Sequence, residues 1–128
     1  MGHGCTICIA DANFPSDAIA QHTTNKVPIR IRGLKTFELL RDILTLFPLD
    51  SYSQTPVCVM DRVINDKVAG LTVPTYAATA EVTNMSLSDL TYHERSDFYL
   101  VAKECFCIVQ TDDRSLYANI IISKGVVP

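Results

Sequence analysis

The sequence lacks both a cluster of like charges and a long apolar segment. Its 128 residues include 11 Lys and Arg and 14 Asp and Glu, a net charge of -3, and these charges stand singly rather than in runs. No basic patch for nucleic acid or anionic lipid is therefore predicted. No uninterrupted apolar stretch approaches the roughly 20 residues that span a bilayer, and the first residues do not resemble a signal peptide. We expect a soluble, cytoplasmic protein with no nucleic acid and no membrane partner.

Internal repeats, low-complexity tracts and Gly/Ser-rich linkers are also missing from the sequence. A chain of this length with 48% hydrophobic residues is long enough to bury one real core. We therefore expect one domain that covers residues 1–128.

The five cysteines are an odd number, which favours free thiols over a disulfide framework. Cys5 and Cys8 have the spacing of a redox or zinc pair, but they lie in a predicted strand, where residues three apart point to opposite sides. Cys105 and Cys107 are expected to share one face of a later strand. Because no second pair and no histidine cluster joins them, we favour packed cysteines and predict no metal and no cofactor.

Short apolar runs alternate with helical patterns, which is typical of an α/β fold with a central β-sheet flanked by helices. Strands are predicted over residues 5–10, 27–32, 57–63, 105–109 and 117–123. Helices are predicted to begin near Ser16 and to cover 36–47, 75–82 and 96–104. The second helix is the clearest, because four apolar residues recur at helical spacing between a Thr36 N-cap and a stop at Pro48.

Several polar side chains stand where a ligand site is expected, and each has a plainer interpretation. Asp11 ends the first strand, and ligands of open α/β sheets bind beyond the carboxyl ends of strands, although an acid there can also cap a helix. His3 lies between two glycines that leave its imidazole uncrowded, yet composition alone favours a terminal histidine without a role. Tyr99, Tyr117 and Asn119 carry polar tips within apolar stretches, as satisfied core groups also do.

Four sequence blocks stand out together. They are Gly2-His3-Gly4, residues 9–15 (Ile-Ala-Asp-Ala-Asn-Phe-Pro), residues 94–103 around Phe98-Tyr99, and residues 116–126, which begin Leu-Tyr-Ala-Asn. In order and spacing these blocks resemble the L-fucose mutarotase and D-ribose pyranase family, and the similarity spans the whole chain. Asn13-Phe14-Pro15 and the block from Pro48 to Tyr52 resemble the fucose branch, whereas the ribose branch tends to carry glycine and leucine before the proline.

The resemblance implies an isomerase that interconverts the anomers of L-fucose without a cofactor. It implies the following roles: His3 as general acid/base, Tyr99 acting at the sugar ring, and Asp11, Asp50, Tyr117 and Asn119 contacting the sugar, with Arg95 a weaker candidate. It also implies closed homo-oligomers, with rings among bacterial members and sites near subunit contacts.

Two departures from the family pattern affect these expectations. Family members usually carry an acidic pair after the glycine-histidine-glycine motif, where this chain has Cys5-Thr6. They also carry about one helix before the motif, so we expect a domain that lacks the usual N-terminal helix.

The residue types suit the implied chemistry. Mutarotation opens a cyclic hemiacetal and recloses it on the other face, so one group takes the anomeric hydroxyl proton and another protonates the ring oxygen. An imidazole, with an ordinary pKa of about 6.5, can do either near neutral pH, and a supported tyrosine hydroxyl can relay a proton. Carboxylates and an amide supply the acceptors and donors that orient a polyol.

Two other classes of function stay open on the sequence alone. A non-catalytic monosaccharide-binding or assembly protein of the same family would keep Asp11, Asp50 and Asn119 but could dispense with His3. A metal-dependent hydrolase would use His3, Asp11 and Asp50, although oxygen-rich ligands on separate strands are a weak zinc signature.

Overall fold

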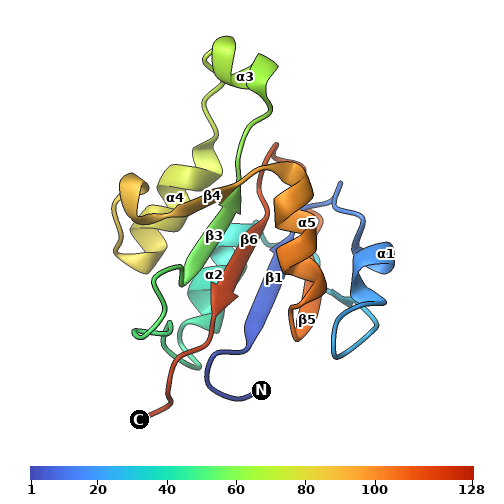
Figure 1. Ribbon diagram of the computed structural model, residues 1–128, viewed down its shortest axis with the longest axis vertical. Helices are drawn as coiled ribbons and strands as arrows, with labels where there is room; N and C mark the ends of the chain where they lie inside the picture. Colours follow the sequence, from blue (N-terminus) through green and yellow to red (C-terminus); the bar gives the residue numbers. More distant parts are fainter.

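One mixed sheet of six strands forms the centre of the molecule in the computed structural model, which describes residues 1–128 (Figure 1). The strands are β1 (Thr6–Ala10), β2 (Ile29–Arg30), β3 (Val57–Met60), β4 (Thr91–His93), β5 (Cys107–Gln110) and β6 (Ile120–Ser123). The helices are α1 (Ser16–Ala20), α2 (Thr36–Ile43), α3 (Ile64–Val68), α4 (Pro74–Thr83) and α5 (Arg95–Lys103), with a 3-10 turn at Leu87–Asp89. The predicted α/β fold is confirmed.

The strand directions decide which loops meet. Across the sheet the order is β2-β5-β1-β6-β3-β4, and β6 alone runs against its neighbours, pairing antiparallel with β1 and with β3. Because β6 is reversed, the residues that precede it lie at the edge where the parallel strands end. The residues that precede β1 and β3 lie at the opposite edge, beside the end of β6.

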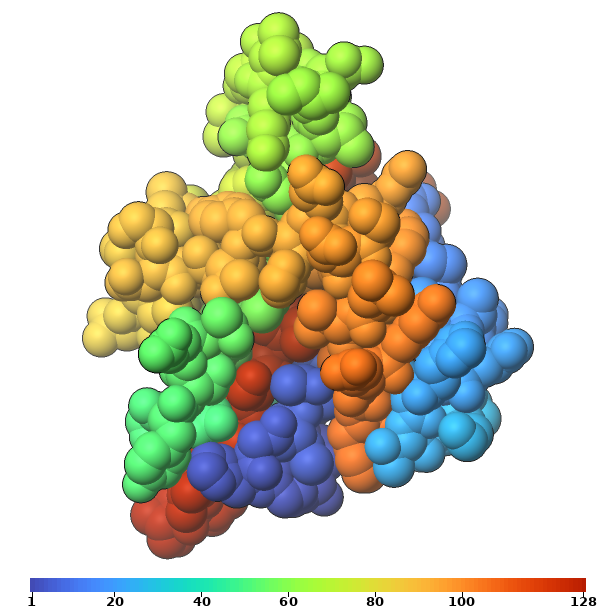
Figure 2. Space-filling view, viewed as in Figure 1, coloured from blue at the N-terminus to red at the C-terminus, as the bar shows by residue number.

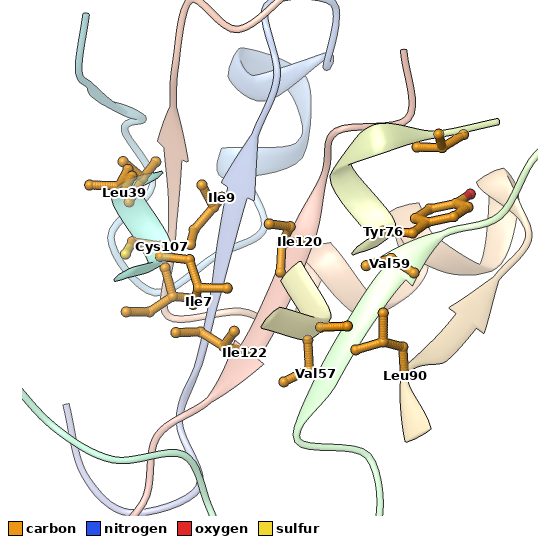
Figure 3. Packing of buried hydrophobic residues seen from close by; sticks show 14 residues of the cluster. Ile7, Ile9, Leu39, Val57, Val59, Tyr76, Leu90, Cys107, Ile120 and Ile122 are labelled. Atoms are coloured by element: carbon orange, nitrogen blue, oxygen red, sulfur yellow. The ribbon is translucent and has the colours of Figure 1, made fainter. Parts of the chain in front are cut away.

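Each face of the sheet carries its own hydrophobic cluster, because alternate strand residues point to opposite sides. Ile7 and Ile9 belong to a cluster of 14 buried residues that packs against α2 and α4 (Figure 3). Cys8 and Ala10 belong to a cluster of 12 that packs against α1 and α5 around the fully buried Phe98. Burying one large apolar side chain contributes roughly 1.5–3 kcal/mol. Both clusters therefore oppose a one-residue slip in strand register.

Most predicted elements are present with different bounds. The predicted strand 27–32 is reduced to Ile29–Arg30, an edge strand with both residues exposed, and the predicted strand 57–63 ends at Met60. Helices α4 and α5 begin and end within one or two residues of the prediction. None of the helices has the length and apolar character needed to cross a membrane.

Helix α2 begins differently from the prediction. The N-cap is Lys35, and Thr36 is the first helical residue. The backbone N–H of Thr36 donates to Oδ2 of the buried Asp113 at 3.0 Å. A carboxylate from the loop after β5 thus satisfies the Thr36 N–H, while the local Glu38 carboxylate accepts the N–H of Lys35 at 2.8 Å. The helix ends at Ile43, before Pro48.

Two elements have no counterpart in the prediction, namely α3 and the three-residue edge strand β4. In Figures 1 and 2 the segment that carries α3 rises above the body of the molecule, at the end opposite the N-terminus. No residue of α3 is buried, and the side chains of Val63, Ile64 and Val68 are exposed. A single turn that buries nothing has no periodic apolar face, so hydrophobic patterning does not detect it.

The five cysteines are free, as predicted. The prediction that Cys105 and Cys107 share a face is wrong: Cys105 packs in the cluster around Phe98, and Cys107 packs in the cluster on the other face. Because β5 begins at Cys107, strand alternation does not extend back to Cys105. Burial raises the pKa of Cys105 to about 12 and that of Cys58 to about 11, as suits packed, protonated thiols.

Candidate functional site

The topology divides the predicted site residues into two groups at opposite edges of the sheet. Asp11 follows β1, Asn119 and Tyr117 precede the reversed strand β6, and Tyr99 lies on α5, so these four line one cavity. His3 precedes β1 and contacts Asp50, which lies before β3, at the other edge. We call the first group the carboxyl-end pocket and the second the amino-end pair.

The carboxyl-end pocket is a cavity of about 260 Å³. Its lining consists of Asp11, Asn13, Phe14, Met60, Asp66, Arg95, Tyr99, Leu116, Tyr117 and Asn119. Pockets for drug-sized ligands span roughly 300–1,000 Å³, so this one suits a small ligand. It lies beyond the carboxyl ends of β1 and β3, where ligands of open α/β sheets bind.

Asp11 is held rigidly in the pocket and is 4% exposed. Its backbone N–H donates to Oδ1 of Asn119 at 2.7 Å, while its carboxylate accepts the N–H groups of Asn13 at 3.0 Å and Ala118 at 3.3 Å. Burial raises the pKa of Asp11, and these two N–H bonds oppose the rise. The arrangement fixes one carboxyl group and one amide for hydrogen bonds to a polar ligand.

Tyr117 has a strained backbone and a fully engaged hydroxyl proton. Its φ of 55° is left-handed, which is costly for a residue with a side chain and is often found at functional sites. Its hydroxyl donates to Oδ2 of Asp66 at 2.5 Å and accepts the backbone N–H of Val63 at 3.2 Å. Burial and the neighbouring Asp66 carboxylate raise the pKa of Tyr117.

The remaining wall of the pocket combines one free phenol, one cation and apolar side chains. The Tyr99 ring meets Phe14 edge-to-face at 5.5 Å, and no hydrogen bond within the chain occupies its hydroxyl. Arg95 is exposed at the start of α5. Phe14, Met60 and Leu116 form the apolar part of the lining. The lining residues that were not predicted as site residues are Asn13, Phe14, Met60, Asp66 and Leu116. Met60 ends a buried strand, where a site is expected.

In the amino-end pair the His3 side chain is exposed and Asp50 is buried beside it. Nε2 of His3 is 2.9 Å from Oδ1 of Asp50, and the two side chains are 46% and 10% exposed. Asp50 is anchored by its backbone N–H, which donates to the carbonyl of Ser123 at 2.9 Å. The bond with His3, helped by the N–H of Tyr52, holds the pKa of Asp50 below its usual range. Gly4, with φ 83°, makes the left-handed turn that leads from His3 into β1.

Strand β1 separates the two groups. Its five residues alone extend about 15 Å at a rise of about 3.3 Å per residue, which is longer than one pyranose ring. One monosaccharide therefore cannot touch His3 and Asp11 of the same chain. For the same reason His3, Asp11 and Asp50 of one chain cannot converge on a single metal ion, which contradicts the hydrolase alternative.

Two larger cavities, of about 350 and 600 Å³, lie on either side of the base of α3. Their shared charged groups are already paired within the chain. Nζ of Lys67 is 2.7 Å from Oδ2 of Asp61, and Nη1 of Arg62 donates to the carbonyl of Leu71 at 2.7 Å. The smaller carboxyl-end pocket, in contrast, holds four of the predicted site residues, Asp11, Tyr99, Tyr117 and Asn119.

Comparisons with known proteins agree with the sequence blocks. Residues 1–127 match the RbsD / FucU transport protein family. The chain is 42% identical to a fucose mutarotase of Danio rerio over 130 residues, which cover 100% of this chain and 83% of that protein. It resembles the crystal structure of FucU from Bifidobacterium longum, with a TM-score of 0.87, 33% identity and coverage of 100% of this chain and 89% of that one.

A second solved structure adds a ligand. It is a fucose mutarotase from Streptococcus pneumoniae in complex with L-fucose, with a TM-score of 0.77, 41% identity and coverage of 100% of this chain and 87% of that one. The predicted resemblance to the fucose branch is confirmed by these relatives.

Proposed function

Because the chain belongs to the RbsD / FucU family, we propose that it is an isomerase that interconverts the α and β anomers of L-fucose. The observation that carries this proposal is the carboxyl-end pocket, where Asp11, Tyr99, Tyr117 and Asn119 surround a cavity of monosaccharide size. A similar protein that is 41% identical has been solved with L-fucose bound.

The lining of the pocket suits a deoxy sugar. Asp11 and Asn119 provide a carboxylate and an amide for ring hydroxyls. Phe14, Met60 and Leu116 provide an apolar wall for the methyl group that replaces one hydroxymethyl group in L-fucose. A hydroxyl group at that position would lose its hydrogen bonds to water against this wall and gain no partner, so a sugar that carries one should bind less well.

The reaction needs two proton transfers. A base removes the proton of the anomeric hydroxyl, the bond between the anomeric carbon and the ring oxygen breaks, and an acid protonates that oxygen. Rotation of the aldehyde and the reverse steps give the other anomer. We assign the general acid/base role to His3, the role at the ring to Tyr99, and the hydroxyl contacts to Asp11, Asp50, Tyr117 and Asn119.

These roles require two copies of the chain, because β1 keeps His3 away from the pocket of its own chain. We infer that the amino-end pair of one copy faces the carboxyl-end pocket of another. Such a contact joins different surfaces of the two copies. Repeating it gives a closed ring when the rotation that relates neighbouring copies divides a full turn evenly. Exposed apolar residues flank both ends: Tyr52 is 80% exposed beside His3, and Ile64 and Leu116, at the other end, are 70% and 59% exposed.

In this arrangement Asp50 supports His3 and also contacts the sugar. Its Oδ1 accepts hydrogen bonds from the His3 ring and the Tyr52 N–H, which leaves Oδ2 for a hydroxyl group. Because its pKa lies below the usual range, Asp50 stays ionised near neutral pH and stabilises a protonated imidazole.

Saturation-transfer NMR of anomer exchange tests the proposed function. The purified chain should accelerate the exchange of L-fucose more than that of D-ribose, because the Asn13-Phe14-Pro15 turn resembles the fucose branch and the apolar wall can contact the methyl group of L-fucose. Equal or faster exchange of D-ribose would contradict the substrate assignment. Binding of L-fucose without faster exchange would instead select a non-catalytic sugar-binding protein.

A further inference from the structure

The α3 segment contacts the carboxyl-end pocket through one side chain. Oδ2 of Asp66, in the middle of α3, accepts the Tyr117 hydroxyl proton at 2.5 Å, and Asp66 itself lines the pocket. The backbone N–H of Val63, just before α3, donates to the same hydroxyl at 3.2 Å. Since α3 buries none of its own residues, these bonds do not follow from packing of the helix.

The two bonds determine what the Tyr117 hydroxyl can offer to a ligand. A tyrosine hydroxyl has one proton to donate and two lone pairs that can accept. Asp66 takes the proton and Val63 occupies one lone pair, so one lone pair remains. While the Asp66 bond is in place, a sugar hydroxyl must be the donor when it meets Tyr117.

A second tether joins the same segment to the body without touching Tyr117. Nζ of Lys67 is 2.7 Å from Oδ2 of Asp61, directly after β3. Neither of these residues lines the carboxyl-end pocket. Two side chains of α3 thus bond to the rest of the molecule, and of these two only Asp66 orients a group in the pocket.

We propose that Asp66 is a positioning residue for the sugar reaction: by holding the hydroxyl proton of Tyr117, it makes Tyr117 an acceptor toward one hydroxyl group of the bound sugar. This inference rests on the proposed function, since it assigns a direction to one hydrogen bond of that site. A charge-assisted bond to a carboxylate is among the stronger hydrogen bonds in proteins, so it is suited to fixing this direction.

Three variants of the full chain test this role. Asp66→Ala removes the acceptor, Asp66→Asn keeps an acceptor oxygen without the charge, and Lys67→Met breaks the other tether of α3. For each variant, KM and kcat of L-fucose exchange are measured by NMR. The Tyr117 titration is followed with tyrosine labelled by ¹³C at Cζ, with the signal assigned from a Tyr117→Phe spectrum. Circular dichroism checks that each variant is folded.

Asp66→Ala should raise KM by about 10-fold or more and change kcat less, because a freely rotating hydroxyl weakens binding of substrate and transition state alike. Asp66→Asn should retain most of the affinity for L-fucose, because its amide oxygen can still accept the proton. In both variants the pKa of Tyr117 should fall, since the carboxylate that raises it is gone. Lys67→Met should leave KM and the Tyr117 titration unchanged.

Wild-type KM and an unchanged Tyr117 titration in Asp66→Ala would overturn the proposal. Equal impairment of Asp66→Asn and Asp66→Ala would also overturn it, because an acceptor oxygen at position 66 would then not orient Tyr117. So would a Lys67→Met variant as impaired as Asp66→Ala, since loosening α3 would explain both. A wild-type chain without anomer exchange would contradict the proposed function instead, and the Tyr117 titration would still show whether Asp66 holds its proton.

Discussion

The two edges of the sheet hold their functional groups in opposite ways. At the carboxyl end Asp11 and Asn119 are each 4% exposed and are fixed by hydrogen bonds within and between two loops, the one after β1 and the one before β6. At the amino end His3 has one side-chain bond, to Asp50, and its side chain is 46% exposed. Burial raises the pKa of Asp11, whereas the imidazole lowers the pKa of Asp50.

This difference indicates a division of labour. A preorganised and partly desolvated pocket is suited to binding and orienting a polyol. An exposed imidazole with a carboxylate behind it is suited to exchanging protons with a molecule outside its own chain. Each edge holds one half of the proposed chemistry, so variants at the two edges should fail in different ways.

Loss of the His3 imidazole should have the largest effect on the rate of anomer exchange. His3→Ala is expected to slow the catalysed exchange of L-fucose by about 10²-fold or more, because a general acid/base contributes on that order. The melting temperature should hardly change, since a largely exposed histidine makes a small contribution to stability. NMR exchange and thermal melts measure both. The control is His22→Ala at another exposed histidine, and an active His3→Ala protein would contradict the assigned role.

Removal of the one unoccupied hydroxyl in the pocket should have a comparable or smaller effect. Tyr99→Phe keeps the edge-to-face contact with Phe14 but removes the group assigned to the ring, so kcat is expected to fall while the fold is kept. The matched control is Tyr92→Phe, which loses a hydrogen bond to the Leu87 carbonyl. Tyr92 belongs neither to the carboxyl-end pocket nor to the amino-end pair. Exchange kinetics that are alike for the two variants would rule out the role of Tyr99.

A substitution at Gly125, which packs against the backbone next to Asp50, should cause a moderate loss of stability. A Cβ at Gly125 would lie 2.4 Å from the carbonyl oxygen of Leu49, the residue before Asp50. Gly125→Ala should therefore lower the free energy of unfolding by roughly 1–3 kcal/mol and displace Asp50. Urea melts measure the first effect. Gly2→Ala, where a Cβ meets nothing within 4 Å, is the control, and equal stability of the two variants would contradict this packing.

The two carboxylates should titrate on opposite sides of the ordinary Asp pKa, which is about 3.9. By ¹³C NMR of Cγ, Asp50 should titrate below this value and Asp11 above it. In His3→Ala the pKa of Asp50 should rise while that of Asp11 stays unchanged. A coupled shift of both carboxylates would show that the two edges are not independent.

These directions also fix how stability depends on pH. Asp50 contributes stability that is present above the ordinary pKa and is lost as the pH falls through its lowered native value. Asp11 does the reverse: its contribution is greatest below the ordinary pKa and weakens as the pH rises toward its raised native value. Replacing either carboxylate should remove only its own part of the pH profile.

The fold was largely predictable, because strand alternation and helical spacing are local properties. In β1, Ile7 and Ile9 point to one face of the sheet and Cys8 and Ala10 to the other, so four consecutive apolar residues indicate a strand buried on both faces. The two features that were missed have no local pattern: α3 buries no side chain, and the acceptor of the Thr36 N–H is Asp113, 77 residues away. Contacts of that kind leave no periodic signal in the sequence.

The site was predictable in its residues but not in its arrangement. Sequence blocks identify His3, Asp11 and Asn119 one by one, and nothing in their spacing reveals that a reversed β6 and the length of β1 place them at two edges. Asp66 was not predicted because it lies in a segment for which no element was predicted, and its partner Tyr117 is 51 residues away.

Mixing two inactive variants tests the two-copy site most directly. His3→Ala keeps an intact carboxyl-end pocket, and Tyr99→Phe combined with Asn119→Ala keeps an intact amino-end pair. If the two edges of different copies form each site, equal amounts of both chains, mixed in denaturant and refolded together, should regain about a quarter of wild-type exchange, because a random contact joins two intact halves once in four. Activity no greater than the average of the two separate variants would contradict a site shared between copies.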